Sequence, residues 1–460
     1  MAISIWNPDW FALPGQAVFD RDRQQVAAVS RAPGHLDLFV IGFDNRVWST
    51  FWSQSGGWNE DWFPLPGAAV FNRDTQQIAA VSRGAGSLDL FVVGFDNRVW
   101  SMAWSDLHGW NLDWFPLPGK ALFDHRTQQV AAVSRAPGNL DLFVLGFDNR
   151  CWSTTWSTAT GWHGDWFPLP GHAVFDHAKQ RIAAVSRAPG NVDLFVLGFD
   201  NHAWSTFWSD VDGWSLDWFP LPGRERFDHE KQHLAAVARA PENLDVFVLG
   251  PDNRGWSTFW TARGGWNGDF FPLPGAAVFD HDKQQIAAVS RATGNIDLFV
   301  LGFDNHGWST SWSDATGWRG DWFPLPGQHV FNRDTQQLTV VAREASSLDL
   351  FVIGFDNHIW STCWGQHDAH PAIRLRAVAE QGRFVEVEGV GFTPNQPVKV
   401  GYDIVAGGGP TTHQFGEDTL TCDAAGRFID RIKVNLGGNI SGAQAQATDL
   451  ASNEVATASI

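Results

Sequence analysis

Aspartates recur along most of this chain at a spacing that invites a test for carboxylate chemistry. The tripeptide Leu/Val/Ile-Asp-Leu/Val places its Asp every 52 residues, at Asp37, Asp89, Asp141, Asp193, Asp245, Asp297 and Asp349. An Asp-Asn series keeps the same spacing and starts at Asp44. Hydrolysis of a glycosidic bond needs one asymmetric pair of carboxylates at a set separation. Carboxylates that recur in every unit favour a structural role instead, and we expect no catalytic residues.

One segment nevertheless has a superficial likeness to a hydrolase motif. Ser313–Trp318, SDATGW, resembles the Asp-box of sialidases, S-x-D-x-G-x-x-W, but it lacks the residue between Ser and Asp. The copy that begins at Ser157 has no Asp at all. Sialidases also use a tyrosine nucleophile, whereas the one Tyr of the chain, Tyr402, lies outside the repeats. We therefore predict that the protein is not an enzyme.

Metal binding is the second chemistry that Asp and His could support. Asp37 and Asp44 are seven residues apart across an expected strand, which is not the compact oxygen cage of a calcium loop. The histidines of the Asp-Asn series lie in different repeats and so do not share a zinc site: His202, His306 and His358. Asp44-Asn45 instead suits a hairpin turn that tolerates positive φ. We expect no metal and no cofactor.

Tryptophan shows the clearest pattern, with 27 Trp among 460 residues. All of them fall into four series with the 52-residue spacing, and Phe270 fills the one remaining slot. The series begin at Trp6, Trp10, Trp48 and Trp52, and none continues beyond residue 364. A fixed period of this length indicates a repeat architecture.

Each repeat reads as short strands joined by turn residues. In the first repeat these are 24–31 (QQVAAVSR), 36–42 (LDLFVIG), 46–53 (RVWSTFWS) and 58–63 (WNEDWF), separated by segments rich in Gly, Pro, Asn and Asp. No stretch has an apolar period of 3.6 residues, so the predicted fold class is all-β. Four strands per unit of 52 residues, repeated seven times, predict a seven-bladed β-propeller.

The two ends of the repeat region are complementary. The last repeat stops after its third strand, and the missing fourth strand, W-N-x-D-W-F-x-L-P-G, is present at 6–15. We therefore predict a ring in which an N-terminal strand completes the last blade. This arrangement removes exposed sheet edges.

The composition changes after residue 365, where both Trp and the repeat end. We predict a propeller over 1–365, a linker over 366–372 and a further domain over 373–460. Alternating apolar runs predict the strands of a small immunoglobulin-like β-sandwich, near 373–379, 383–390, 397–405, 427–434, 442–448 and 454–460.

The net charge of −18 narrows the range of partners. An acidic surface disfavours nucleic acid and anionic membranes, because both require clustered Lys and Arg. No apolar run approaches the roughly 18 residues of a membrane span, so we expect no membrane insertion. The N-terminal residues do not resemble a signal peptide. We expect synthesis for the cytoplasm, with release by a non-classical route as a further expectation.

Binding is the function that remains, and Trp points to sugars. An indole offers a flat apolar face with an N–H donor on its edge, which matches the C–H patch and hydroxyl groups of a sugar ring. We expect most Trp to be structural and to fill the gaps between blades. Polar groups stand beside them, including an Arg series that begins at Arg31, for which a structural pair with a neighbouring Asp is the alternative.

The predicted sugar-binding residues belong to the Trp48 and Trp6 series and to the Asn, Arg/His and Thr positions beside the former. The fifth repeat is left out because it diverges most, with Pro251 and Phe270 at positions that are otherwise Phe and Trp. The set is Trp6, Asn45, Arg46, Trp48, Thr50, Trp58, Asn97, Arg98, Trp100, Trp110, Asn149, Arg150, Trp152, Thr154, Trp162, Asn201, His202, Trp204, Thr206, Trp214, Asn305, His306, Trp308, Thr310, Trp318, Asn357, His358, Trp360 and Thr362.

The repeat QQVAAVSRAPGNLDLFVLGFDNRxWSTxWSxxxGWxxDWFPLPG resembles that of the bacterial PLL-type lectins, seven-bladed β-propellers that bind L-fucose and O-methylated sugars. The resemblance covers residues 1–365. It implies shallow sites in grooves between adjacent blades, fucosylated or O-methylated glycans as partners, and self-association into homo-oligomers. The domain after residue 365 departs from the family pattern. A protein-binding scaffold is the main alternative function, and a propeller glycosidase is the third.

Overall fold

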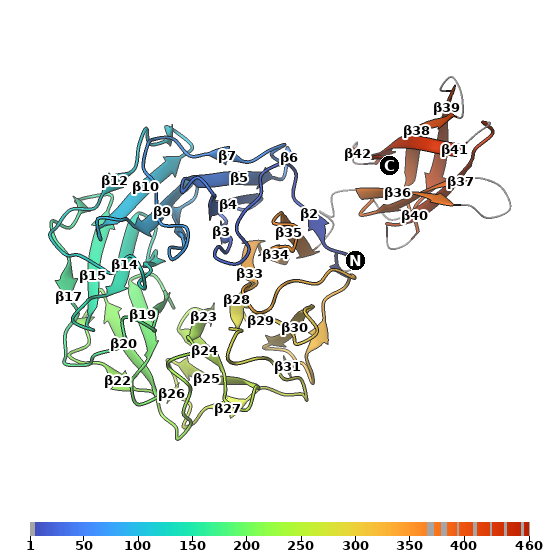
Figure 1. Cartoon of the computed structure of the whole chain (residues 1–460). Coiled ribbons are helices and arrows are strands. Elements are labelled where there is room, and N and C mark those ends of the chain that lie inside the picture. The colour runs from blue at the N-terminus through green and yellow to red at the C-terminus, as the bar shows by residue number, and fades with distance from the viewer. Residues whose placement is uncertain are drawn as a thin grey trace. The chain divides into compact units, whose positions relative to one another are not determined.

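The computed structural model of the chain (Figure 1) describes residues 5–365, 372–378, 384–392, 395–407, 412–423, 426–436, 439–451 and 455–459. Every regular element in these ranges is a β-strand, which confirms the predicted fold class. In this part of the chain, no helix is long and apolar enough to cross a membrane. The chain forms two compact units, of which the larger is Asp9–Thr362.

Each 52-residue repeat folds into one antiparallel sheet, which is a blade of the propeller. In the first blade β3 (Ala27–Val29), β4 (His35–Ile41), β5 (Val47–Ser53) and β6 (Gly57–Trp58) are neighbours in that order, and β7 (Phe63–Pro64) also pairs with β5. The hairpin between β4 and β5 has the predicted turn, because Asn45 and its six equivalents all have φ between 62° and 66°.

The next five blades repeat this plan. The second contains β8 (Ala79–Gly84), β9 (Ser87–Val93), β10 (Val99–Ser105), β11 (Gly109–Trp110) and β12 (Phe115–Pro116). The third contains β13 (Ala131–Val133), β14 (Asn139–Leu145), β15 (Cys151–Ser157), β16 (Gly161–Trp162) and β17 (Phe167–Pro168). The fourth contains β18 (Ala183–Val185), β19 (Asn191–Leu197), β20 (Ala203–Ser209), β21 (Gly213–Trp214) and β22 (Phe219–Pro220).

The fifth blade contains β23 (Ala235–Ala240), β24 (Asn243–Leu249), β25 (Gly255–Thr261), β26 (Gly265–Trp266) and β27 (Phe271–Pro272). The sixth contains β28 (Ala287–Val289), β29 (Asn295–Leu301), β30 (Gly307–Ser313), β31 (Gly317–Trp318) and β32 (Phe323–Pro324). Figure 1 shows these sheets arranged around a common centre, with the short first strands innermost.

The seventh blade is built from both ends of the repeat region. Its sheet contains β33 (Thr339–Glu344), β34 (Ser347–Ile353) and β35 (Ile359–Gly365), and β1 (Ile5–Trp6) and β2 (Phe11–Ala12) pair with β35. The partners are Trp6 with Trp364 and Phe11 with Ser361. The predicted closure by an N-terminal strand is confirmed.

The middle strands are apolar on both faces because each blade packs between two others. In β4, Leu36, Leu38 and Val40 contact the seventh blade, whereas Phe39 and Ile41 contact the second. Asp37 shares the face of Phe39 by the two-residue alternation of a strand. The cores of the propeller therefore lie between blades, and a polar side chain on β4 is enclosed between two sheets.

The Trp10 series is structural, as expected for most Trp. Trp114 is buried and packs edge-on against Phe71, with ring centroids 4.7 Å apart. Phe270 takes the equivalent place against Phe227, at 4.9 Å. The smaller ring fills the same position, so this departure of the fifth repeat leaves the blade intact.

A ring of buried glutamine side chains joins the inner parts of all seven blades. Gln24 Nε2 donates to the Gln76 carbonyl at 2.8 Å, and Gln24 Oε1 accepts from the Ile41 amide at 3.3 Å. The donor step repeats from each glutamine to the next and returns to the first, through Gln76, Gln128, Gln180, Gln232, Gln284 and Gln336. The circuit closes on itself.

The C-terminal domain has two antiparallel sheets. One contains β36 (Ala372–Val378), β37 (Phe384–Val390) and β40 (Phe428–Lys433); the other has the order β39 (Thr412–Thr421), β38 (Pro397–Gly407), β41 (Asn439–Asp449) and β42 (Val455–Ser459). Val387 and Ile432 from the first sheet share a core with Val400 and Ala447 from the second. This confirms a β-sandwich, while its immunoglobulin-like topology stays a prediction.

One strand of this domain was not predicted. β39, with the sequence THQFGEDTLT, is largely exposed and has no run of alternating apolar residues. Its polar composition hid it, because sequence patterns detect a strand chiefly through its buried face. Apart from Ala372, the predicted linker at 366–372 lies outside the described residues.

Candidate functional site

A cavity of about 200 Å³ lies in the groove between the fourth and fifth blades. The fourth blade contributes Arg187, Asp193 and Phe207, and the fifth contributes Trp260 and Trp266. Aromatic rings therefore form part of its wall, and one cation and one carboxylate stand among them. This combination makes the groove the candidate functional site.

The backbone register explains why Arg and Asp meet there. Val185 lies opposite Asp193 in the antiparallel pair β18–β19, and Arg187 follows two residues after Val185, just beyond the end of β18. Arg187 Nη1 donates a hydrogen bond to Asp193 Oδ1. The guanidinium also lies over the ring of Trp260, 4.6 Å from its centroid, which adds a cation–π contact across the groove.

Two polar atoms of this pair have no hydrogen-bond partner although they are buried. They are Asp193 Oδ2 and Arg187 Nε. Glu242 Oε2 lies 3.7 Å from Arg187 Nε, which is longer than a hydrogen bond. Buried polar groups in native proteins are normally satisfied. One free acceptor and one free donor in the same groove suit a ligand that carries hydroxyl groups.

Burial dominates the electrostatics of the groove. It raises the pKa of Asp193 to about 7, although Arg187 opposes the shift, and Glu242 adds to it. The same burial raises the pKa of Asp37, Asp89, Asp141, Asp245 and Asp297 to about 6. Such values are common at functional sites, but here each carboxylate is held by its own arginine.

The contact of an arginine with a Trp of the next blade recurs in the other grooves, which separate adjacent blades from the first to the sixth. Arginine lies over the Trp of the following blade at 4.4–5.8 Å in the pairs Arg31–Trp104, Arg83–Trp156, Arg135–Trp208 and Arg239–Trp312. Oδ2 is also without a partner in Asp37, Asp89 and Asp141. Asp245 differs, because both of its oxygens accept from Arg239.

The grooves differ at one rim position. Asp106, Asp210 and Asp314, here called the rim acids, occupy it in alternate grooves and raise the pKa of the paired aspartate in each: Asp37, Asp141 and Asp245. Asp210 Oδ1 accepts from Trp208 Nε1 at 3.1 Å and lies 3.6 Å from Arg135 Nε. The grooves between them carry Thr158 and Ala262 at this position. The propeller therefore has two kinds of groove.

The groove between the seventh and first blades is closed. Arg343 lies over Trp52 at 4.6 Å, as in the other grooves. Here, however, the side chains are covered, with 4% of Arg343 and 1% of Trp52 exposed. The equivalent Trp104 and Trp260 are only partly buried. We expect this groove to admit no ligand.

The predicted site residues do not come together in one place. Trp266, in the Trp6 series, lines the cavity. Its equivalents Trp110 and Trp162 pack against Phe39 and Phe91 of the preceding blade, with ring centroids 5.8 Å apart in each pair. The Trp48 series lies at the opposite end of the blade, beside the β4–β5 hairpin, where Trp48 Nε1 donates to Asp44 Oδ1 at 3.0 Å. The two series therefore do not share a site.

The predicted Asn and Thr positions serve the backbone and core. Asn97 Oδ1 lies 2.7 Å from His125 Nδ1 and ties the hairpin to the next loop. Thr50 is 1% exposed, inside the sheet. His202 Nδ1 lies 2.8 Å from Asp200 Oδ2, at the same end of the blade as Trp48. These residues therefore lie apart from the Trp58-type rings, and the hypothesis that they hold a sugar stays a prediction.

The Trp52 series is absent from the predicted set, and the sequence alone does not decide between a structural and a ligand-binding role for the Arg31 series. Arginine is both the structural partner of an aspartate and a wall of the groove. The sequence does indicate the pairing of arginine with aspartate, because Arg31 stands six residues before Asp37 across a tight turn. The stacking partner Trp104 lies in the next repeat, so no pattern within one repeat shows it. The fifth repeat, left out of the predicted set, supplies two Trp to the cavity.

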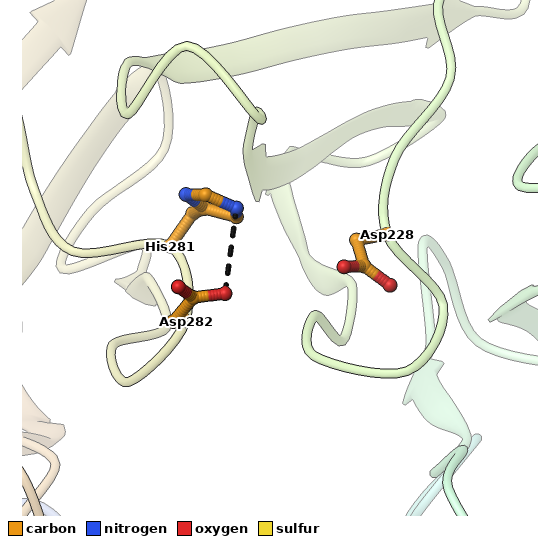
Figure 2. Close-up of side chains that lie close together, drawn as sticks. All are labelled: Asp228, His281 and Asp282. Atoms are coloured by element: carbon orange, nitrogen blue, oxygen red, sulfur yellow. Dashed lines mark ion pairs between the residues drawn. The ribbon is translucent and has the colours of Figure 1, made fainter.

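One cluster of possible metal ligands occurs among the described residues, and Figure 2 shows it: Asp228, His281 and Asp282. His281 Nε2 lies 3.6 Å from Asp282 Oδ1. Asp228 and His281 occupy the positions of Asp20 and Arg73, which form an ion pair of 2.9 Å. In the first two blades this position therefore pairs charges between blades, and the expectation that the protein binds no metal stays a prediction.

Comparison with known proteins adds to this geometry. No protein-family model and no curated protein matches the chain. Among solved structures, the BP39L lectin from Burkholderia pseudomallei is similar with a TM-score of 0.61 and 18% identity, over 75% of this chain and 98% of that chain.

Two fungal structures are more distant. AofleA from Arthrobotrys oligospora has a TM-score of 0.47 and 13% identity, over 68% of this chain and 89% of its own. The six-bladed β-propeller lectin of Aleuria aurantia has a TM-score of 0.42 and 15% identity, over 68% and 99%. Taken together with the sheet topology, the likeness to BP39L establishes the propeller fold.

Proposed function

We propose that the protein is a multivalent lectin whose sugar sites are the grooves between adjacent blades. The observation that carries this proposal is the groove of the fourth and fifth blades. There Trp260 and Trp266 face a cavity in which Asp193 Oδ2 and Arg187 Nε have no hydrogen-bond partner. The similar BP39L structure is that of a lectin, which supports the proposal.

The chemistry of a sugar matches this groove. The C–H face of a pyranose packs on an indole, and a hydroxyl group can donate to Asp193 Oδ2 while a neighbouring oxygen accepts from Arg187 Nε. When Asp193 is ionised the pair carries no net charge, so a neutral sugar satisfies it. We further propose fucose-type or O-methylated sugars, because a methyl group would gain contact with the aromatic wall.

Several such grooves on one rigid ring would act together. A small site formed by one wall and two polar groups binds weakly, and a Kd near 1 mM corresponds to about −4 kcal/mol. Simultaneous binding of several grooves to one glycan-bearing surface can raise the overall affinity by about 10²–10⁴. The proposal includes no catalysis, since the buried carboxylate that recurs in the grooves is held by its own arginine.

A binding test with single-groove resolution is available. Equilibrium dialysis with saturating methyl fucoside would count the sugars bound per chain. Asp193→Asn removes the charged acceptor of one groove, and we expect the count to fall by one. The matched control is Asp252→Asn, whose carboxylate accepts from Trp256 Nε1 at 2.9 Å at the far end of a blade; it should leave the count unchanged.

The outcomes separate the competing functions. A glycan array with no bound sugar at any density would contradict the lectin and favour the protein-binding scaffold. Release of reducing sugar from a bound glycan would favour the glycosidase. An equal loss in both variants would place the sites outside the grooves.

A further inference from the structure

The C-terminal β-sandwich has a polar cleft on the outer face of its larger sheet. The cleft has a volume of about 690 Å³ and crosses β38, β39, β41 and β42. This volume lies within the roughly 300–1,000 Å³ of ordinary small-ligand sites.

The cross-strand register explains the shape of the cleft. Gly401 is paired with Glu417 on β39 and with Gln446 on β41, and Gln446 is paired with Thr457 on β42. These four positions form one row across the sheet, and Gly401 contributes no side chain to it. A Cβ at Gly401 would meet only the Gln446 carbonyl, at 3.9 Å. The missing side chain leaves a hollow in the middle of the sheet.

The charges around the hollow are already paired. Lys399 Nζ lies 2.8 Å from Glu417 Oε2. Asp403 Oδ1 lies 2.9 Å from His413 Nδ1. A ligand is therefore not needed to neutralise the cleft, and a charged ligand would have to displace one of these pairs.

The groups that remain free are amides and hydroxyls. Gln444, Gln446 and Thr457 line the cleft, and among the described residues no side-chain hydrogen bond holds the two glutamines. A side-chain amide offers both donors and an acceptor, which matches the vicinal hydroxyl groups of a sugar.

An exposed aromatic ring stands beside these groups. Phe415 lies opposite Asp403 in the β38–β39 pair, and 72% of it is exposed. The ring of His413 stacks on it with centroids 5.5 Å apart and an interplanar angle of 10°. Because His413 covers only one face of Phe415, the other face of this apolar ring is available to a ligand beside the polar cleft.

We propose that this cleft is a second glycan-binding site, which takes a neutral, hydroxyl-rich oligosaccharide. The glutamine amides bind its hydroxyl groups above Gly401, and Phe415 packs against the apolar face of an adjoining sugar unit. The inference goes beyond the proposed groove function, because it requires no propeller site.

The test uses the full chain and substitutions on the outer face of the sheet. Gly401→Val fills the hollow, and Val suits a strand position whose φ is ordinary and whose Cβ makes only a van der Waals contact with the Gln446 carbonyl. Phe415→Ala removes the exposed ring without disturbing the core. Ile429→Ala is the matched control, because Ile429 is exposed on β40 of the opposite sheet.

We expect a glycan array to contain spots whose signal falls by about tenfold in the Gly401 and Phe415 variants and is kept in the Ile429 control. All 27 Trp lie at or before residue 364, so a groove ligand should alter Trp fluorescence, and the Gly401 and Phe415 variants should leave that change intact. Spots that respond equally to all variants, an array without bound glycans, or capture of peptides alone would overturn the proposal.

Discussion

The aspartates of the Asp37 series, which line the grooves, are almost inaccessible to water. Asp193 is 3% exposed and keeps its arginine partner within the same groove. The desolvation of a buried ion pair can cancel much of its Coulomb attraction. The pair is therefore better suited to organising a site than to stabilising the ring, and a ligand hydroxyl on Oδ2 would offset part of the desolvation.

The raised pKa of Asp193 predicts a pH-dependent stability. Because the folded pKa of about 7 exceeds the ordinary value of 3.8, the folded state binds more protons than the unfolded state between these pH values. The free energy of unfolding contributed by this group should therefore fall as pH rises from 4 to 7. Asn does not titrate, so Asp193→Asn should gain stability relative to the parent chain over this range.

The expected gain is about 1.4 kcal/mol for each unit of pKa shift in the folded state. Chemical denaturation of both proteins at pH 5 and pH 8 measures it. The exposed Asp212→Asn is the control and should show no such trend. A constant difference between the Asp193 variant and the parent at both pH values would contradict the shift.

The rim acids predict discrimination against anionic glycans. Asp210 lies 3.6 Å from Arg135 Nε, so a carboxylate already occupies the cation that an acidic sugar would seek. Replacing Asp106, Asp210 and Asp314 by Asn should raise the binding of uronic-acid glycans by about fivefold, the equivalent of roughly 1 kcal/mol of repulsion. Neutral glycans on the same array should change less; an equal rise for both would contradict the electrostatic role.

Among the elements, the N-terminal strands have the largest consequence. β2 pairs with β35, and the Leu13 amide donates to the Ile359 carbonyl at 2.8 Å. Without them, β35 would be an open edge strand, which is a template for aggregation.

Deletion of residues 1–12 should therefore lower the Tm by about 10 °C or more, or leave only aggregated chains. Thermal unfolding with size-exclusion chromatography measures both effects. Removal of residues 366–460, whose described strands all belong to the two sheets of the C-terminal domain, is the control and should leave the unfolding of the ring in place. A deletion without effect would show that the ring closes by other contacts.

The blades could be predicted from sequence because the strands and turns of a blade follow one another within one 52-residue period of the sequence. Turn residues such as Asn45 must adopt positive φ, and the nearly continuous apolar run of LDLFVI is typical of a strand buried on both faces. The site could not be predicted in the same way. Its contacts join residues of different repeats, as in Arg31 and Trp104, and only packing between blades decides which Trp of four series meets which arginine.

At the scale of the whole molecule, the ring of glutamine side chains consists of hydrogen bonds between blades, which no single blade could form alone. Gln180 Nε2 donates to the carbonyls of His229 and Gln232, and Gln180 Oε1 accepts from the Leu197 amide. One side chain therefore satisfies three backbone groups, two of which belong to the next blade.

Gln180→Met keeps the length of the side chain and removes these bonds. Since each unsatisfied buried group costs about 1–3 kcal/mol, we expect the free energy of unfolding to fall by roughly 2–4 kcal/mol. Denaturant unfolding measures the change, with the exposed Lys179→Met as control. A loss no greater than that of the control would show that water replaces the amide.

The ring of glutamine side chains also restricts how the number of repeats in such a protein can change during evolution. Every amide in the circuit points from one repeat to the next, and the seventh points to the first. A gene that gained or lost one 52-residue unit would have to rebuild the whole circuit at a new curvature. The walls of the grooves have no such restriction, as Asp106, Thr158 and Ala262 show at one equivalent position. Selection can thus diversify the sites one at a time, while the number of units can change only for the ring as a whole.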